Sequence, residues 1–200
     1  METPVRGIRF IHKAILVEAG RIESAAAEGR GAAVAERLSF FERVLDLHNT
    51  GEEVGLFPDI DARAPDIVPA YLLEHREEKV LFANLRDACA SGGANLAQAA
   101  AAVAAHLRLH IKKEEELIVP LVERLFSVPE QGAQVGKMLA QFTPADMGRV
   151  LPWLVTALEV DDRRTYLGLM EKVVPPDRFG GVLVTVKAGV TPEVWASLGR

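Results

Sequence analysis

The sequence is poor in cysteine and in aromatic residues. A single cysteine, Cys89, occurs among 200 residues, which excludes a disulfide within the chain and a zinc module built on cysteines. Aromatic side chains make up 6% of the chain, which disfavours a surface that stacks on nucleic-acid bases. The net charge of −5 and the lack of a basic block also argue against nucleic acid as a partner.

Long hydrophobic runs are missing as well. A helix needs about 20 apolar residues to cross a bilayer, and no run in this sequence approaches that length. The first seven residues carry charges and a proline where a secretory signal has an apolar block. We therefore expect a soluble, cytoplasmic protein with no membrane partner. Its 49% of hydrophobic residues is enough for one sizeable core.

Two segments of the chain, residues 48–58 and 110–120, are near copies of each other. Each begins with a histidine, has a glutamate four residues later and ends with a proline. Residues four apart lie one above the other on the same face of a helix, so each segment presents an imidazole and a carboxylate together. Such a pair can bind a metal ion, and two pairs can hold two ions. The pairs are His48 with Glu52 and His110 with Glu114.

Hydrophobic periodicity predicts four long helices with short joints. Apolar residues recur at spacings of three and four over about residues 4–28, 31–57, 69–90 and 95–127. Glycine-rich breaks, and a loop rich in proline and aspartate, separate these stretches. The pattern predicts an all-α fold, an up-down-up-down four-helix bundle, over residues 4–127.

The composition of the chain changes after residue 127, where the fourth predicted helix ends. No histidine follows residue 110, and helix-start patterns occur near Thr143, Val174 and Thr191. Residues 182–186 have the β-propensity of a strand, but a lone strand has nothing to pair with, so we expect a helix there. We predict that residues 128–200 form a C-terminal helical extension packed on the bundle, and that residues 130–200 offer a surface for a protein partner.

Polar side chains recur on the predicted apolar seams, where burial is costly unless they are paired or bind metal. One buried histidine is usually a hydrogen-bonded core residue, but a histidine on each of four seams favours a metal site. Nitrogen and oxygen donors without sulfur suit iron or manganese, with zinc as an alternative. Six ligands on four helices suit two ions. The candidate ligands are His12, His48, Glu52, His75, His110 and Glu114.

The ferritin-like di-iron motif, Glu-x-x-His, does not fit this chain. Leucine stands three residues before the histidine at Leu45, Leu72 and Leu107, where that motif requires glutamate.

The order of the candidate ligands resembles the hemerythrin-like family, the HHE cation-binding domains. The family pattern is a lone histidine, then His-x-x-x-Glu, then a lone histidine, then His-x-x-x-Glu, and the chain matches it in order over about residues 4–127. The resemblance implies two irons joined by an oxo or hydroxo group, with Glu52 and Glu114 bridging them and two histidines on each. It also implies an open position for O2, nitric oxide or peroxide. Manganese and zinc are alternative occupants.

The later part of the chain carries a second, weaker likeness. Residues 151–154, Leu-Pro-Trp-Leu, and 172–175, Lys-Val-Val-Pro, are similar to the region after this domain in plant iron-regulating ubiquitin ligases. The zinc modules of those ligases need cysteines that this chain lacks, so their ligase activity does not carry over.

Several neighbours of the predicted ligands have alternative roles. His106 lies one turn before His110 and is predicted to be a seventh ligand, a hydrogen-bond partner of a ligand or a core residue. Glu78 is expected to support the ligands, and Tyr71 to line the core or supply a phenolate. Glu53 and Glu115 lie about 100° further round their helices than the predicted ligands, although hemerythrin itself takes a carboxylate at the position of Glu115.

Three functions are compatible with such a site. The first is a protein that binds or senses O2, nitric oxide, peroxide or iron status. The second is a di-iron enzyme, either a peroxidase or catalase or one that handles nitric oxide. The third is an iron-dependent interaction module that uses the C-terminal extension. Groups around the site decide among these three functions.

Overall fold

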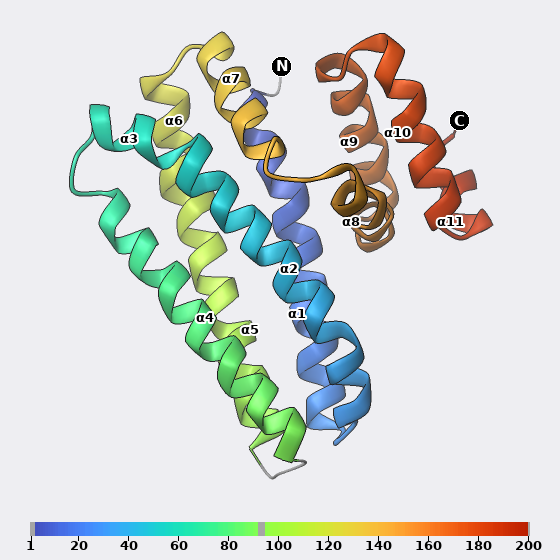
Figure 1. The fold of residues 1–200 in the computed structure, drawn as a ribbon. Coiled ribbons are helices and arrows are strands. Elements are labelled where there is room, and N and C mark those ends of the chain that lie inside the picture. The colour runs from blue at the N-terminus through green and yellow to red at the C-terminus, as the bar shows by residue number, and fades with distance from the viewer. Residues whose placement is uncertain (1–2, 92–94, 200) are drawn as a thin grey trace. The chain divides into compact units, whose positions relative to one another are not determined.

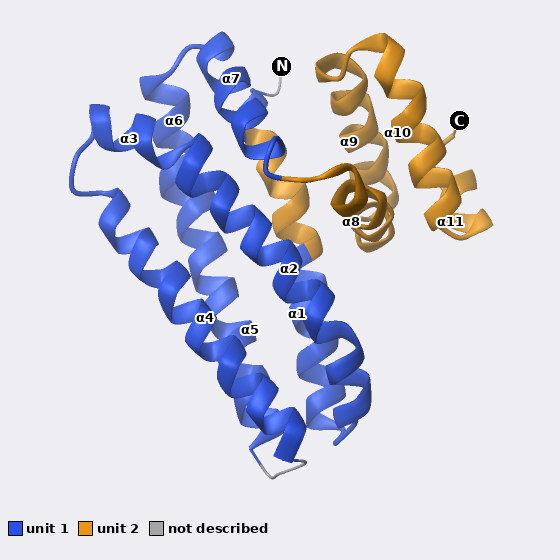
Figure 2. Ribbon diagram, in the orientation of Figure 1, with its two compact units in different colours: residues 1, 3–5, 15–141 blue, residues 2, 6–14, 142–200 orange. Residues whose placement is uncertain are grey.

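The computed structural model describes residues 3–91 and 95–199, and within these ranges every regular element is a helix. The predicted all-α class is therefore confirmed. The chain divides into two compact units (Figure 2). Unit 1 comprises residues 3–5 and 15–141, and unit 2 comprises residues 6–14 and 142–200. In the part of the chain that the structure describes, no helix is long and apolar enough to span a membrane.

Helix α1, Ile8–Ala27, follows a short 3-10 turn at Pro4–Gly7 and contributes residues to both units. Its later part belongs to unit 1, together with α2 (Gly31–Gly55), α4 (Val68–Ser91) and α5 (Leu96–Lys113). Helix α4 packs beside both α2 and α5 (Figure 1). The short helix α3, Phe57–Arg63, begins with Pro58 in its first turn and connects α2 to α4.

The seam predicted for α2 is buried as expected. The side chains of Val34, Leu38, Phe41, Leu45, His48 and Glu52 are all withdrawn from solvent. On α4 the last buried position is Ala88, and the side chain of the following Cys89 is half-buried.

A π-helical turn at Glu114–Ile118 joins α5 to α6 (Val119–Leu125). The wide turn is marked by the Val119 N–H, which donates to the carbonyl of Glu114 five residues earlier. Pro120 explains the location, because a proline inside a helix has no N–H to donate and crowds the preceding turn. The extra residue shifts the register, so that Ile118 is buried and Leu117 is 59% exposed.

Helix α7, Val128–Leu139, also belongs to unit 1, although the change in composition placed the domain boundary before it. It packs against α2, where Gly51 and Gly55 allow a close approach. A Cβ atom at Gly55 would lie 2.8 Å from the backbone nitrogen of Met138. The amide of Gln134 also donates to Asp59 of α3 over 3.2 Å. These contacts move the boundary of the unit to residue 141.

Unit 2 contains four further helices, α8 (Pro144–Ala157), α9 (Val160–Val173), α10 (Pro176–Gly189) and α11 (Pro192–Ser197). The expected starts near Thr143 and Thr191 are confirmed, since each threonine accepts a backbone N–H three residues later. The stretch 182–186 is helical within α10, as predicted.

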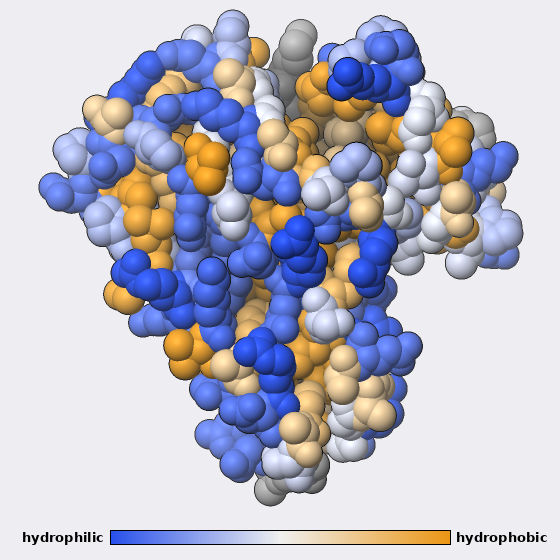
Figure 3. Space-filling model, viewed as in Figure 1, coloured by the Kyte–Doolittle hydropathy of each residue, from blue (hydrophilic) through white to orange (hydrophobic). Residues whose placement is uncertain are grey.

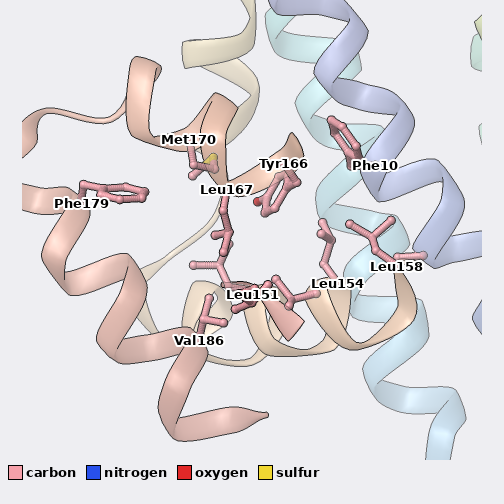
Figure 4. Packing of buried hydrophobic residues seen from close by; sticks show 12 residues of the cluster. Phe10, Leu151, Leu154, Leu158, Tyr166, Leu167, Met170, Phe179 and Val186 are labelled. Atoms are coloured by element: carbon pink, nitrogen blue, oxygen red, sulfur yellow. The ribbon is translucent and has the colours of Figure 1, made fainter. Parts of the chain in front are cut away.

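The core of unit 2 is built from apolar side chains of α8, α9 and α10 and from Phe10 of α1 (Figure 4). Phe10 meets Tyr166 edge-on, with ring centroids 5.5 Å apart. Leu151, Leu154 and Leu167 are among the residues that fill the space between these helices.

Candidate metal centre

Three helical segments of unit 1 supply five of the six predicted ligands. Helix α2 carries His48 and Glu52, α4 carries His75, and the end of α5 with its π-turn carries His110 and Glu114. Their side chains are 1–5% exposed. Five polar side chains buried at one level of the bundle are costly unless each finds a partner or a metal.

The ligand atoms of these residues converge in two sets. One atom each from Glu52, His75, His110 and Glu114 lies within 4.8 Å of the others, and His48 meets the same criterion with the two glutamates. Both sets share Glu52 and Glu114, so the carboxylates stand between the histidines.

The individual distances show which imidazole nitrogens face the carboxylates. Nε2 of His75 lies 3.5 Å from Glu52 Oε2, and Nε2 of His48 lies 3.5 Å from Glu52 Oε1. Nε2 of His110 lies 3.1 Å from Glu114 Oε1. All three rings therefore turn the same nitrogen toward the centre.

The opposite nitrogen of two of these rings is held by an outer carboxylate. Nδ1 of His75 is 2.8 Å from Glu53 Oε1, and Nδ1 of His110 is 2.8 Å from Glu74 Oε2. Glu74 also binds Lys113. Such carboxylates fix the ring orientation and tautomer of metal-binding histidines and leave Nε2 available. Helical spacing disfavours Glu53 as a ligand, in agreement with this outer position. It does not predict a role for Glu74, and the only indication in the sequence is that Glu74 is next to His75.

The side chains of the site carry less positive charge than its two buried carboxylates would need to stay ionised. Burial raises the pKa of Glu52 well above its usual value, and the nearby Glu114 raises it further. Burial lowers the pKa of His110, but its contacts with Glu114 and Glu74 outweigh this and raise the pKa to about 10. Two carboxylates buried side by side repel each other unless a proton or a cation lies between them.

The donor atoms fit a metal ion. Glu52 Oε2 and His75 Nε2 are buried and have no hydrogen-bond partner within the described residues. A cation between them would satisfy both atoms. Oxygen and nitrogen donors of this kind suit iron, manganese or zinc. The buried histidines and glutamates of unit 1 therefore fit a metal site by composition, geometry and charge.

His106 lies beside the centre rather than in it. Its ring stacks on that of His110, with centroids 6.0 Å apart and an angle of 8° between the planes. It is half-buried and belongs to neither ligand set. Burial and the neighbouring His110 lower the pKa of His106. This arrangement favours a supporting role over that of a seventh ligand.

Tyr71, Glu78 and Glu115 take different positions. The Tyr71 hydroxyl faces the carbonyl of Lys113 at 3.5 Å, and burial together with the site glutamates raises its pKa to about 12, so it stays a neutral phenol. Glu78 is buried and accepts a hydrogen bond of 2.9 Å from the Asn49 amide. Glu115 is exposed, which favours Glu114 as the carboxylate of this segment.

His12, the sixth predicted ligand, lies on α1 and its side chain is fully buried. It falls within residues 6–14, which belong to unit 2. Burial of this imidazole agrees with the predicted apolar seam.

Comparison with known proteins adds to these observations. Residues 3–140 match the family described as Hemerythrin HHE cation binding domain. The chain is 25% identical over 190 residues to Zinc finger protein BRUTUS of Arabidopsis thaliana, covering 88% of this chain and 15% of that protein. A BRUTUS-like zinc finger protein of the same plant is 24% identical over 193 residues, with 87% and 15% covered. The chain thus spans about 15% of the length of these curated relatives. No solved structure matches it.

Proposed function

Because the chain belongs to the Hemerythrin HHE cation binding domain family, we propose that it binds two iron ions through the buried histidines and glutamates of its bundle. The observation that carries this proposal is the pair of ligand sets in unit 1 that share Glu52 and Glu114. Two carboxylates common to two sets of histidines suit two cations better than one. The proposed ligands are His12, His48, Glu52, His75, His110 and Glu114.

The assignment gives each ion its own histidines. His75 and His110 belong to one set and would hold the first ion, while Glu52 and Glu114 would bridge the pair. His48 belongs to the second set, which needs another imidazole. We assign that role to His12, because it is fully buried and stands at the first histidine of the family pattern.

Iron would supply redox chemistry and an open coordination position for O2, nitric oxide or peroxide. The protein's own residues orient and shield the site. Glu53 and Glu74 hold two imidazole rings in place through Nδ1. Phe57 stacks on His75 with ring centroids 5.6 Å apart, and Tyr71 lies edge-on to His110 at 6.1 Å. These rings exclude water from one side of the centre.

We further propose that the site reports a small oxidant or the iron status of its surroundings. The likeness of the later part of the chain to plant iron-regulating ubiquitin ligases favours iron status as the signal. Residues 130–200 are then the proposed surface for a protein partner.

Iron analysis tests the proposed metal content directly. Protein reconstituted with ferrous iron and desalted should hold two irons per chain, and Glu114→Ala should lose most of them. Glu116→Ala is the matched control, because Glu116 is exposed on the same turn. Iron content well below two in the unaltered chain, or equal loading of both variants, would contradict the proposal.

Turnover separates reversible binding from catalysis. If the protein is a sensor, iron-loaded protein should not consume peroxide or nitric oxide over many cycles. Sustained consumption that disappears in Glu52→Ala would instead identify a di-iron enzyme.

A further inference from the structure

A cavity of about 470 Å³ opens between α2 and α4 in unit 1. It is lined by polar and charged side chains from both helices and by the buried Leu45 and Phe82. Hydrophilic residues predominate over α2 and α4 on the face shown in Figure 3. The cavity is thus an opening from solvent into the side of the bundle.

Asn49 and Glu78 line this cavity and are its most buried polar residues, at 3% and 4% exposed. The Asn49 amide donates to Glu78 Oε1 over 2.9 Å. The amide oxygen of Asn49, Oδ1, and the second carboxylate oxygen of Glu78, Oε2, are buried and have no hydrogen-bond partner among the described residues. Both of these atoms are acceptors, so they suit a cation or a hydrogen-bond donor and not an anion.

The two residues also adjoin the metal centre along the chain. Asn49 follows His48 directly, and Glu78 lies one helical turn after His75. The proposed ligands of unit 1 are almost fully withdrawn from solvent, so an ion needs a path to reach them. The cavity extends inward to Asn49 and Glu78, which adjoin two of these ligands in the sequence.

Each positively charged side chain on the wall of the cavity lies near a carboxylate, and Arg43 is 3.9 Å from Asp46. Lys79 of α4 lies 3.6 Å from Asp46 of α2, and Arg86 of α4 pairs with Glu42 of α2. The Lys79–Asp46 and Arg86–Glu42 pairs each connect the two helices. Their side chains are exposed or half-buried, so these ion pairs are weak and water can replace either partner. A hydrated cation can therefore pass between them without meeting a fixed unpaired positive charge.

We infer that this cavity is the uptake route for ferrous iron, and that the Glu78 carboxylate and the Asn49 amide oxygen bind the ion in transit to the centre. The inference rests on the proposed di-iron function. It assigns Glu78 a role in the rate of loading, not in the final coordination of the metal.

The test compares how fast metal-free variants take up Fe²⁺ under anaerobic conditions, with free iron quenched by a chromogenic chelator at successive times. Glu78→Gln keeps the acceptor used by Asn49 but removes the charge, and it should load at least fivefold more slowly while reaching the same final iron content. Glu77→Gln changes an exposed neighbour on the same helix and should load at the unaltered rate.

A second variant tests the route without touching a buried group. Asp46→Phe fills the opening from an exposed position and should also slow uptake, whereas Glu36→Phe, at an exposed position of α2 outside the cavity, should not. Unaltered rates in both Glu78→Gln and Asp46→Phe would overturn the uptake route. A reduced final content in Glu78→Gln would make Glu78 a ligand and also overturn the inference. Failure of the unaltered chain to bind iron would instead refute the proposed function.

Discussion

Some residues around the centre face the proposed metals, and others hold these ligands in place. Glu53 and Glu74 take the second role, since each contacts the Nδ1 atom of a histidine whose Nε2 faces a site glutamate. Both are more exposed than the ligands they support. Their contribution is therefore to ligand geometry.

Removing the charge of Glu74 should weaken metal binding without abolishing it. Glu74→Gln loses the charged acceptor at His110 Nδ1 and the ion pair with Lys113. Outer partners of this kind typically contribute about 10–100-fold to metal affinity, so we expect a loss in that range by competition with a chelator. Glu77→Gln is the control, and equal affinities of the two variants would contradict the assigned role.

Glu78 should make the stability of the metal-free protein depend on pH. Burial raises its pKa to about 7, against the lowering effect of His110, His75 and the Asn49 hydrogen bond, while Glu114 raises it further. A carboxyl whose pKa is raised on folding stabilises the protein below its unfolded pKa, and this contribution is lost as the pH rises through 7.

Glu78→Gln cannot lose a proton and so should escape this loss. Relative to the unaltered chain, its free energy of unfolding in urea should increase by on the order of 2 kcal/mol between pH 5 and pH 8. A difference between the two proteins that does not change with pH would show that Glu78 is not the titrating group.

At the scale of elements, close contact between α2 and α7 holds the bundle together near the centre. Gly55 allows this contact, because an added Cβ would meet Met138 and the carbonyl of Gln134 at 2.8–2.9 Å. Backbone atoms cannot yield as a flexible side chain would. The contact lies one turn from Glu52, so the packing of α7 and the geometry of the site are linked.

Gly55→Ala should destabilise the protein by roughly 1–3 kcal/mol through overpacking, despite the better helix propensity of alanine. Gly136→Ala on α7 is the matched control, since nothing lies within 4 Å of its added Cβ and alanine should stabilise the helix slightly. Thermal unfolding of both variants measures the difference. Equal stabilities would mean that α7 does not approach α2 so closely.

The helices and their buried faces could largely be predicted from the sequence, and the reasons for the exceptions are local. Apolar spacing placed the seam of α2 through Glu52, and threonine caps placed the starts of α8 and α11. The π-turn at Glu114 was missed, because hydrophobic spacing alone cannot register one extra residue. The contact of Glu74 with His110 was missed too, since it joins two helices whose relative rotation the sequence does not state.

At the scale of the whole molecule, two units share the helix α1. The expected boundary at residue 127 follows the change in composition, whereas the observed boundary at residue 141 follows the packing of α7. Composition is a weak guide here, because the buried residues of α7 are two polar glutamines, Gln131 and Gln134.

Removal of metal should lower the stability of the entire chain. An ion that binds the folded state alone adds about 2.7 kcal/mol when its concentration is about 100 times its dissociation constant, and its loss also leaves the buried carboxylates of Glu52 and Glu114 in mutual repulsion. Calorimetry before and after chelation should show a clear fall in the melting temperature, restored by added iron. An unchanged melting temperature would indicate a site that is exposed or weak.

The central claim is that one chain holds two iron ions that share Glu52 and Glu114. Mössbauer spectroscopy of iron-57-loaded protein tests this most directly, because it reports the number of irons and whether their spins couple. We predict two irons per chain in a spin-coupled pair, and a smaller amount of this pair in Glu114→Ala. A spectrum of isolated, uncoupled ions at one per chain or fewer would contradict the claim.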